Sequence, residues 1–157
     1  MSIERVRDYF RPLGREGDIL EFPVSSATVE LAAQAVGVIP ARIAKTLSFL
    51  VDGVCVLIVA AGDAKIDNSK YKGFFHTKAK MLTQEQAREM TGHAVGGVCP
   101  FGIDNPAVTA YLDVSLRRFA TVYPAAGNAA SAVRLSCGEL DILSNSSGWI
   151  DVCKNWS

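Results

Sequence analysis

The chain has 157 residues, of which 49% are hydrophobic and 20% are charged, a balance that fits one globular domain and excludes extensive disorder. Sixteen Lys and Arg residues balance sixteen Asp and Glu residues, so strong non-specific binding to DNA or another phosphate backbone is not expected. The longest apolar run, residues 54–61, is too short for a membrane-spanning helix, and no signal-peptide pattern stands at the start. We therefore expect one domain over residues 1–157, cytoplasmic and without a membrane partner.

Apolar spacing and capping residues predict the first elements of the chain. Apolar residues three and four positions apart indicate a helix over 3–13, and the apolar residues of 18–24 indicate a strand. Ser25 and Ser26 are predicted to cap a helix over 28–36, because Ser side chains accept hydrogen bonds from the first free N–H groups of a helix.

A β-hairpin is the clearest local prediction. Residues 46–51 and 54–60 are apolar and rich in β-branched side chains, and only Asp52 and Gly53 separate them. Pro40 suits the first turn of a short helix that leads into this hairpin.

The second half of the chain mixes helices with short strands. Capping boxes predict helices over 83–91 and 136–143. The other elements expected are a helix over 67–75 and strands over 108–114, 119–123, 132–135 and 149–152. Because regular strand–helix–strand alternation is absent, we expect an α+β fold with a mixed, largely antiparallel, β-barrel-like sheet flanked by short helices.

Lys45 is the first candidate for chemistry. It stands where the short helix ends and the buried strand begins, among apolar neighbours. Such a lysine either extends its ammonium group to the surface, as most lysines do, or lies at a pocket mouth. In a pocket, partial burial lowers the lysine pKa, and the group can donate to a carbonyl or phosphate oxygen. The residues alone leave both interpretations open.

The segment 91–102 is the second candidate, because it contains four glycines and a proline after a capped helix. It either exposes consecutive backbone N–H groups to a carbonyl oxygen, oxyanion or phosphate, or forms a tight surface loop. The same segment contains His93 and Cys99, which make a Cys–His nucleophile pair conceivable. No metal-ligand spacing is visible, so no metal is predicted.

The third candidate is the segment 123–128, which is again rich in small residues after a strand. Its Asn128 side chain is suited either to reading an amide or amine edge or to stabilising a turn.

Three segments, taken together, carry a family resemblance. They are residues 44–47, residues 91–102, and residues 119–140, with residues 59–63 fitting between them. In this order they resemble the YbaK/ProX family of aminoacyl-tRNA deacylases, which is related to the editing domain of bacterial prolyl-tRNA synthetases. The resemblance covers roughly residues 20–143. It implies a β-barrel-like sheet with one pocket, and hydrolysis of the ester between an amino acid and the 3′ end of a mischarged tRNA, with neither metal nor organic cofactor.

The resemblance also implies roles for particular residues. Lys45 matches the functional lysine of the family, and Gly96 and Gly97 match the glycine pair that supplies backbone groups to the pocket. The substrate-binding residues that it implies around them are Thr46, His93, Val98, Cys99, Pro100, Phe101, Gly127 and Asn128. The implied partners are the acceptor end of mischarged tRNA, in particular tRNA(Pro), and prolyl-tRNA synthetase.

The amino acid that is removed stays open at this point. Cysteine editors of the family carry a Ser-Gly-Gly turn followed by an acidic residue, where this chain has residues 125–127 and Ala132. Ala, Ser, Thr, Cys and 2-aminobutyrate are the small amino acids considered. Two other function classes stay open as well: a non-catalytic module that binds tRNA or a synthetase, and an enzyme of another class that uses Cys99 with His93.

Overall fold

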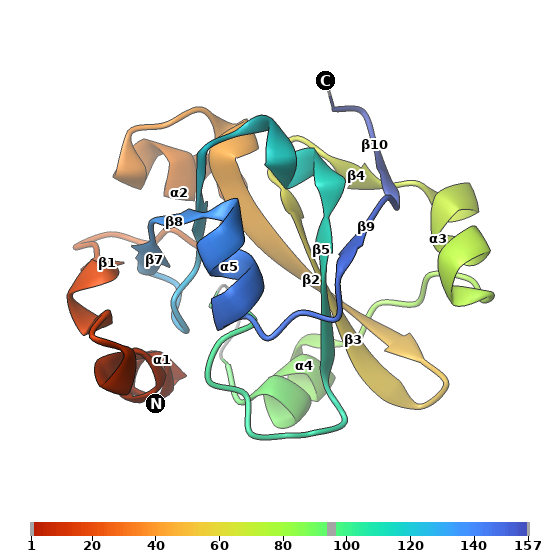
Figure 1. Cartoon of the computed structure of the whole chain (residues 1–157), viewed down its shortest axis with the longest axis horizontal. Helices are drawn as coiled ribbons and strands as arrows, with labels where there is room; N and C mark the ends of the chain where they lie inside the picture. The colour runs from red at the N-terminus through yellow and green to blue at the C-terminus, as the bar shows by residue number, and fades with distance from the viewer. Residues whose placement is uncertain (1, 94–96, 157) are drawn as a thin grey trace.

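The computed structural model describes residues 2–93 and 97–156. A curled six-stranded sheet with the order β8-β6-β2-β3-β5-β9 forms its centre (Figure 1). Strands β2 (Ile43–Val51) and β3 (Val54–Ala61) form the predicted hairpin. Asp52 and Gly53 have φ angles of 50° and 80°, the left-handed values that a two-residue type I′ turn requires, so the hairpin prediction is confirmed.

The sheet is mixed, as expected. Strand β6 (Thr121–Pro124) runs parallel to β2, and β5 (Thr109–Asp113) runs parallel to β3 and to β9 (Trp149–Ile150). Antiparallel pairing joins β2 to β3 and β6 to β8 (Leu135–Ser136). The parallel neighbours follow long connections, because a tight hairpin joins only antiparallel strands.

Two further antiparallel ladders lie outside the central sheet. Strand β1 (Ile19–Glu21) pairs with β7 (Ser131–Val133), and β4 (Lys65–Ile66) pairs with β10 (Cys153–Lys154). The single strand predicted over 132–135 is therefore wrong, because the chain changes partner there: β7 pairs with β1, whereas β8 pairs with β6.

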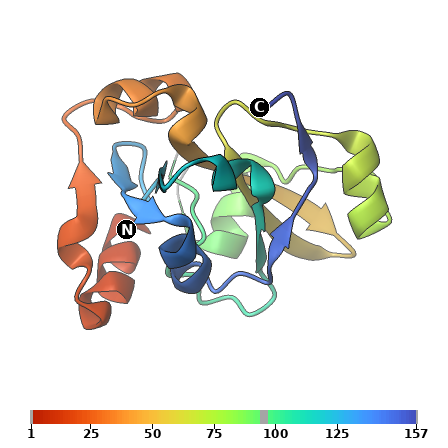
Figure 2. The same cartoon turned by 45° about the horizontal axis from the view of Figure 1, so that its top comes forward.

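Five helices and four short 3₁₀ turns are described in residues 2–93 and 97–156. The helices are α1 (Ser2–Phe10), α2 (Val29–Val36), α3 (Asn68–Phe75), α4 (Gln84–Thr91) and α5 (Cys137–Leu143). The 3₁₀ turns are η1 (Arg11–Leu13), η2 (Glu16–Asp18), η3 (Pro40–Arg42) and η4 (Val114–Arg118). Helices α1 and α3 lie at opposite ends of the molecule in both views (Figures 1 and 2).

The capping predictions are confirmed at two helices and wrong at one. Both capping boxes are present, at the starts of α4 and α5. At α2 the cap is Thr28, whose hydroxyl oxygen accepts a hydrogen bond from the Leu31 N–H at 3.1 Å. Ser26 donates instead to the carbonyl oxygen of Ala129 at 3.3 Å, because the chain before α2 packs against residues 129–130.

Helix α1 packs against Phe101 and Gly102, at the end of the second candidate segment. Val6 and Phe10 are fully buried, and the Phe10 ring contacts the Phe101 ring edge-on, with 5.2 Å between the ring centroids. A Cβ at Gly102 would lie 3.0 Å from the Arg5 carbonyl oxygen, so glycine permits the close approach of helix and segment.

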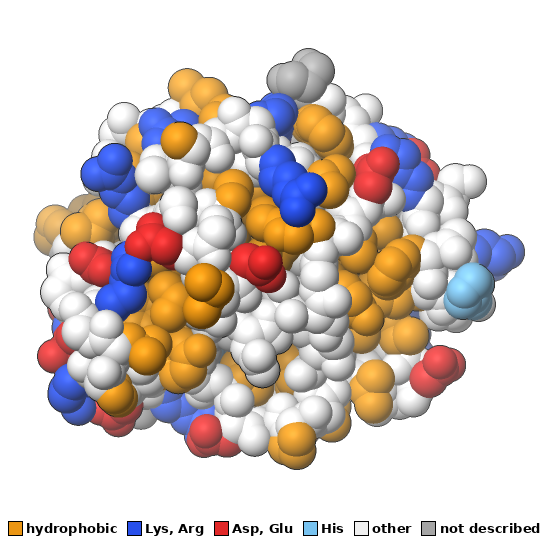
Figure 3. Space-filling model, in the orientation of Figure 1, with side chains coloured by type: hydrophobic (Ala, Val, Ile, Leu, Met, Phe, Trp, Pro, Cys, Tyr) orange, Lys and Arg blue, Asp and Glu red, His pale blue; other side chains and the backbone are white. Residues whose placement is uncertain are grey.

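The surface carries charges of both signs. On the face shown in Figure 3, Lys and Arg side chains are dispersed among Asp and Glu side chains, in keeping with the zero net charge. No helix in the described part of the chain has the length and apolar character of a membrane span.

Candidate functional site

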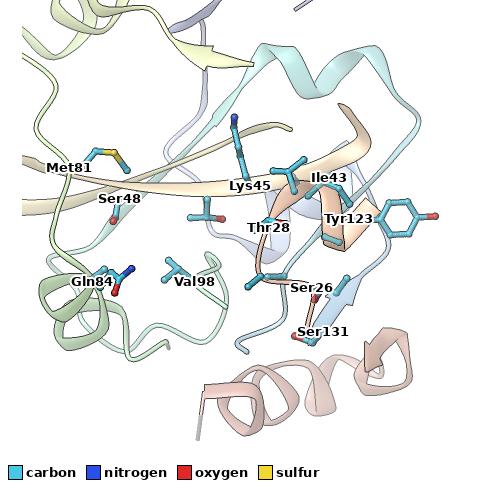
Figure 4. A pocket seen from close by; sticks show the side chains of 18 of the residues that line it. Ser26, Thr28, Ile43, Lys45, Ser48, Met81, Gln84, Val98, Tyr123 and Ser131 are labelled. Atoms are coloured by element: carbon cyan, nitrogen blue, oxygen red, sulfur yellow. The ribbon is translucent and has the colours of Figure 1, made fainter. Parts of the chain in front are cut away.

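A cavity of about 300 Å³ lies beside β2, between α2 and α4 (Figure 4). Its size is at the lower end of the range for small-molecule sites. Small apolar side chains form much of its wall, among them Ala32, Ala44, Ala87 and Ala132. The cavity therefore has room for a small ligand.

Alternate residues of β2 reach opposite sides of the strand. Thr46 and Ser48 both line the cavity. Lys45 directly precedes Thr46 in sequence, and Figure 4 shows its side chain pointing away from Ser48 and Gln84. Lys45 also belongs to the lining of the cavity, but because successive side chains of a strand alternate between its faces, its ammonium group lies on the side of β2 away from Ser48.

The ammonium group of Lys45 is held by the turn between β3 and β4. Its Nζ donates to the carbonyl oxygens of Ala64 and of Gly62, the latter at 3.4 Å. Burial lowers the pKa of Lys45, and the nearby Asp63 carboxylate opposes that shift. The half-buried lysine of the sequence prediction is thus found beside the cavity, with two carbonyl oxygens that favour its protonated form.

The turn that holds Lys45 is itself fixed from both sides. A Cβ at Gly62 would lie 2.1 Å from the carbonyl oxygen of Pro40, so residue 62 packs directly on η3. Arg118 forms an ion pair with Asp63, with its nitrogens 2.6 and 3.0 Å from the two carboxylate oxygens. The Arg118 guanidinium also stacks on the Trp156 ring, 5.1 Å from its centroid. The C-terminal tryptophan therefore packs near the Lys45 turn.

The structure brings the second and third candidate segments together. A Cβ at Gly97 would lie 2.3 Å from the backbone nitrogen of Asn128 and 2.5 Å from the carbonyl carbon of Gly127. The side chain of Val98, the next residue, lines the cavity. Gly96 falls outside the described residues, so its proposed role stays a prediction.

His93, Cys99 and Phe101 are placed in the protein interior and are not among the side chains that line the cavity. The His93 Nε2 lies 2.7 Å from the Phe101 carbonyl oxygen and 3.6 Å from the Cys99 sulfur. Burial raises the pKa of the Cys99 thiol to about 12 and lowers the pKa of His93. Both groups are therefore neutral at physiological pH, which disfavours the thiolate–imidazolium pair that a cysteine nucleophile needs.

The remaining predicted site residues have structural contacts. Asn128 Oδ1 accepts a hydrogen bond from the Ala130 N–H at 2.9 Å, which is the turn-stabilising interpretation of this side chain. Gly127 has a φ of 101°, a value that favours glycine. Pro100 is buried beside a second, more polar hollow near α5. Among the described residues, no group of three or more His, Cys, Asp or Glu side chains is placed to hold a metal ion.

Sequence reasoning missed several cavity residues. Ser48 carried a usable signal, because it is a polar residue inside an apolar strand, two positions from Thr46. Other polar residues of the lining come from distant elements and had no local signal for a site: Ser26, Thr28, Gln84 and Ser131.

The chain matches the profile of the aminoacyl-tRNA editing domain over residues 24–142. It is 54% identical to the uncharacterized protein YwhH of Bacillus subtilis (strain 168), over 99% of each chain. A solved structure of a candidate trans-editing enzyme for prolyl tRNA synthetase is similar with a TM-score of 0.87 and 31% identity, covering 98% of this chain and 97% of that one.

A further similarity links the chain to part of a larger enzyme. It is 34% identical over 77 residues to a proline–tRNA ligase of Maridesulfovibrio salexigens, which is 48% of this chain but 13% of the ligase. The chain thus matches a small portion of that ligase, whereas it matches YwhH throughout. The profile match covers most of the chain, including β2 and the segment around Gly97, and this protein belongs to the family of aminoacyl-tRNA editing domains.

Proposed function

We propose that the protein is a trans-editing deacylase, which hydrolyses the ester between a small amino acid and a mischarged tRNA. The observation that carries this proposal is the cavity of about 300 Å³, whose lining includes Lys45 and also Val98, the residue after Gly97. In a member of the editing-domain family, such a cavity is suited to the aminoacyl group, and the tRNA end then lies at its mouth.

The reaction proposed is hydrolysis by water. The oxygen of a water molecule attacks the ester carbonyl carbon, the bond from that carbon to the 3′-terminal ribose oxygen breaks, and a proton from the water passes to the ribose oxygen. Free amino acid and uncharged tRNA are the products. The backbone N–H groups of Gly97 and Val98 would stabilise the oxyanion, and one such donor contributes roughly 3 kcal/mol in well-studied hydrolases.

Lys45 is proposed to act as a cation toward the tRNA. Its ammonium group lies on the side of β2 away from Ser48, so contact with the terminal phosphate fits its position better than contact with a group deep in the cavity. A cation at this place would hold the acceptor end while the aminoacyl group enters the cavity. A protein of zero net charge needs few such contacts if it grips the tRNA end alone.

The proposed tRNA is tRNA(Pro), and the proposed protein partner is prolyl-tRNA synthetase. Support comes from the names of two similar proteins, a candidate trans-editing enzyme for prolyl tRNA synthetase and a proline–tRNA ligase. The small cavity supports a small amino acid as the group on that tRNA. A pocket distinguishes two amino acids that differ by one methylene group by about 1–3 kcal/mol.

The test is a deacylation assay with tRNA(Pro) charged with Ala, Ser, Thr, Cys or 2-aminobutyrate. Wild type and Lys45→Ala are compared, and Lys65→Ala serves as a matched control because Lys65 is exposed on β4 and does not line the cavity. We expect rapid loss of at least one ester, a large decrease in Lys45→Ala, and little change in Lys65→Ala.

The alternative is a module that binds tRNA or a synthetase without catalysis. A protein that retards the charged tRNA in a gel but discharges none of the five esters would establish that alternative and contradict the proposal.

A further inference from the structure

We infer that Thr46 and Ser48 form a pair of hydroxyl groups that recognises a neutral polar side chain on the amino acid, so that seryl esters are preferred over apolar esters of the same size. This inference rests on the proposed function and names the substrate class of the same cavity. Both residues lie on β2, two positions apart, and both line the cavity.

The hydroxyl oxygen of Thr46 is buried and has no hydrogen-bond partner among the described residues. Buried hydroxyl groups in folded proteins almost always have a partner, since an unsatisfied one has lost its water without compensation. At the wall of a cavity, an unpartnered hydroxyl points to a partner that arrives with a ligand.

Ser48 extends the same polar strip. Its side chain is 9% exposed, and no hydrogen bond joins its hydroxyl to another described residue. Thr46 and Ser48 pair through the β2–β3 ladder with Val59 and Leu57, so their backbone groups belong to the sheet. The two residues are spaced about 6–7 Å apart along one strand face, and their hydroxyls are therefore the groups of β2 that remain for a ligand.

Four other Ser and Thr hydroxyl groups around the cavity are already engaged, and Figure 4 shows the Tyr123 ring pointing away from Lys45 and Ser48. Thr28 and Thr83 accept hydrogen bonds from the N–H groups of Leu31 and Gln86 as helix caps. The remaining two are Ser131, which contacts the Ala126 N–H and the Asn128 carbonyl oxygen, and Ser26, which donates to Ala129. This contrast singles out Thr46 and Ser48.

The surroundings define the chemistry of the ligand group. No Asp or Glu lines the cavity, and the ammonium group of Lys45 is bound to carbonyl oxygens on the other side of β2. A group that meets a hydroxyl in such a place is neutral, and an alcohol can donate to or accept from either of the two hydroxyls. The neighbouring side chains, Ala44, Ala87 and Val98, restrict the space around it to a short side chain.

The test compares seryl-tRNA(Pro) with 2-aminobutyryl-tRNA(Pro), because the two side chains differ by a hydroxyl in place of a methyl group. Wild type, Thr46→Val and Ser48→Ala are measured, with Thr109→Val on β5 as a control outside the cavity. We expect wild type to discharge the seryl ester about tenfold faster, which is the gain from one additional hydrogen bond. Thr46→Val and Ser48→Ala should each decrease this ratio severalfold, whereas Thr109→Val should preserve it.

A wild-type ratio near one, or a ratio that neither cavity substitution changes, overturns the inference and leaves the deacylase function intact. A ratio that neither substitution changes is also what binding of the hydroxyls to the α-amino group would give, because both esters share that group. If wild type discharges neither ester, recognition is measured by calorimetry instead, and the proposed function fails only if none of the five esters is discharged. The probes are the seryl and 2-aminobutyryl amides of 3′-amino-3′-deoxyadenosine, and the inference stands only if wild type prefers the seryl amide and Thr46→Val does not.

Discussion

Gly97 packs so closely on Asn128 that a Cβ at residue 97 would lie 2.3 Å from the Asn128 backbone nitrogen. Non-bonded atoms do not approach to that distance, so any other residue at position 97 must displace one of the two segments. The contact joins the segment before Val98, which lines the cavity, to the turn after β6. The absence of a side chain at Gly97 therefore determines where the backbone beside the proposed oxyanion site lies.

Gly97→Ala is therefore expected to destabilise the protein by roughly 2 kcal/mol and to decrease deacylation strongly, because the backbone beside the cavity must move. Thermal unfolding followed by circular dichroism measures the first effect, and the tRNA(Pro) assay measures the second. Gly73→Ala is the control: it lies in α3, where a Cβ meets nothing within 4 Å, and it should stabilise the helix slightly. A Gly97→Ala variant as stable and active as wild type would contradict the close packing.

Lys45 should make tRNA binding sensitive to alkaline pH. Burial lowers its pKa from the ordinary lysine value, so the ammonium group loses its proton at a lower pH than an exposed lysine does. Affinity for tRNA should decrease as pH rises through that lowered pKa. In Lys45→Arg the decrease should move to higher pH, because a guanidinium stays charged. Binding titrations of a tRNA acceptor-stem hairpin across the alkaline range test this, and identical pH profiles for the two proteins would exclude Lys45 as the responsible cation.

The lowered pKa of Lys45 also affects stability. Its contribution to the free energy of unfolding should rise with pH, whereas the affinity for tRNA should fall. Because the folded state binds the Lys45 proton less tightly than the unfolded state does, unfolding takes up a proton between the two pKa values. This group should therefore increase the free energy of unfolding as pH rises through that interval. The increase should be absent in Lys45→Met, which a comparison of urea unfolding curves for the two proteins at alkaline pH would show.

Thr46→Val and Thr28→Val should change stability in opposite directions. The Thr46 hydroxyl is buried without a partner, so replacing it by a methyl group should raise the free energy of unfolding by about 1 kcal/mol. The Thr28 hydroxyl caps α2, so the same substitution there should lower that free energy by about 1 kcal/mol. Urea unfolding of both variants decides the matter, and a destabilised Thr46→Val protein would mean that the hydroxyl has a partner in solution.

Cys99 should be inert to alkylation in the native protein. Its side chain is 0% exposed and its thiol pKa is raised to about 12, so little reactive thiolate is present. Brief iodoacetamide treatment should modify the half-buried Cys137 before Cys99 and leave deacylation unchanged. Mass spectrometry of the labelled peptides, together with the activity assay, tests this. Loss of activity in step with Cys99 labelling would favour the enzyme class that uses Cys99 with His93.

The sequence by itself determined the elements whose causes are local. The β2–β3 hairpin follows from Asp52 and Gly53, whose left-handed φ angles a two-residue turn requires. Helices α4 and α5 begin where a capping box satisfies their first N–H groups. In each case a few neighbouring residues carry the whole interaction, so the pattern is readable without the rest of the molecule.

Only the tertiary structure decided how the site is assembled. It put Thr46 and Ser48 at the cavity and the Lys45 ammonium on the opposite side, because the two faces of β2 pack against different elements. It also joined Gly97 to Asn128, which are far apart in the chain. Such contacts depend on how sheet and helices pack together, and no short stretch of residues encodes them.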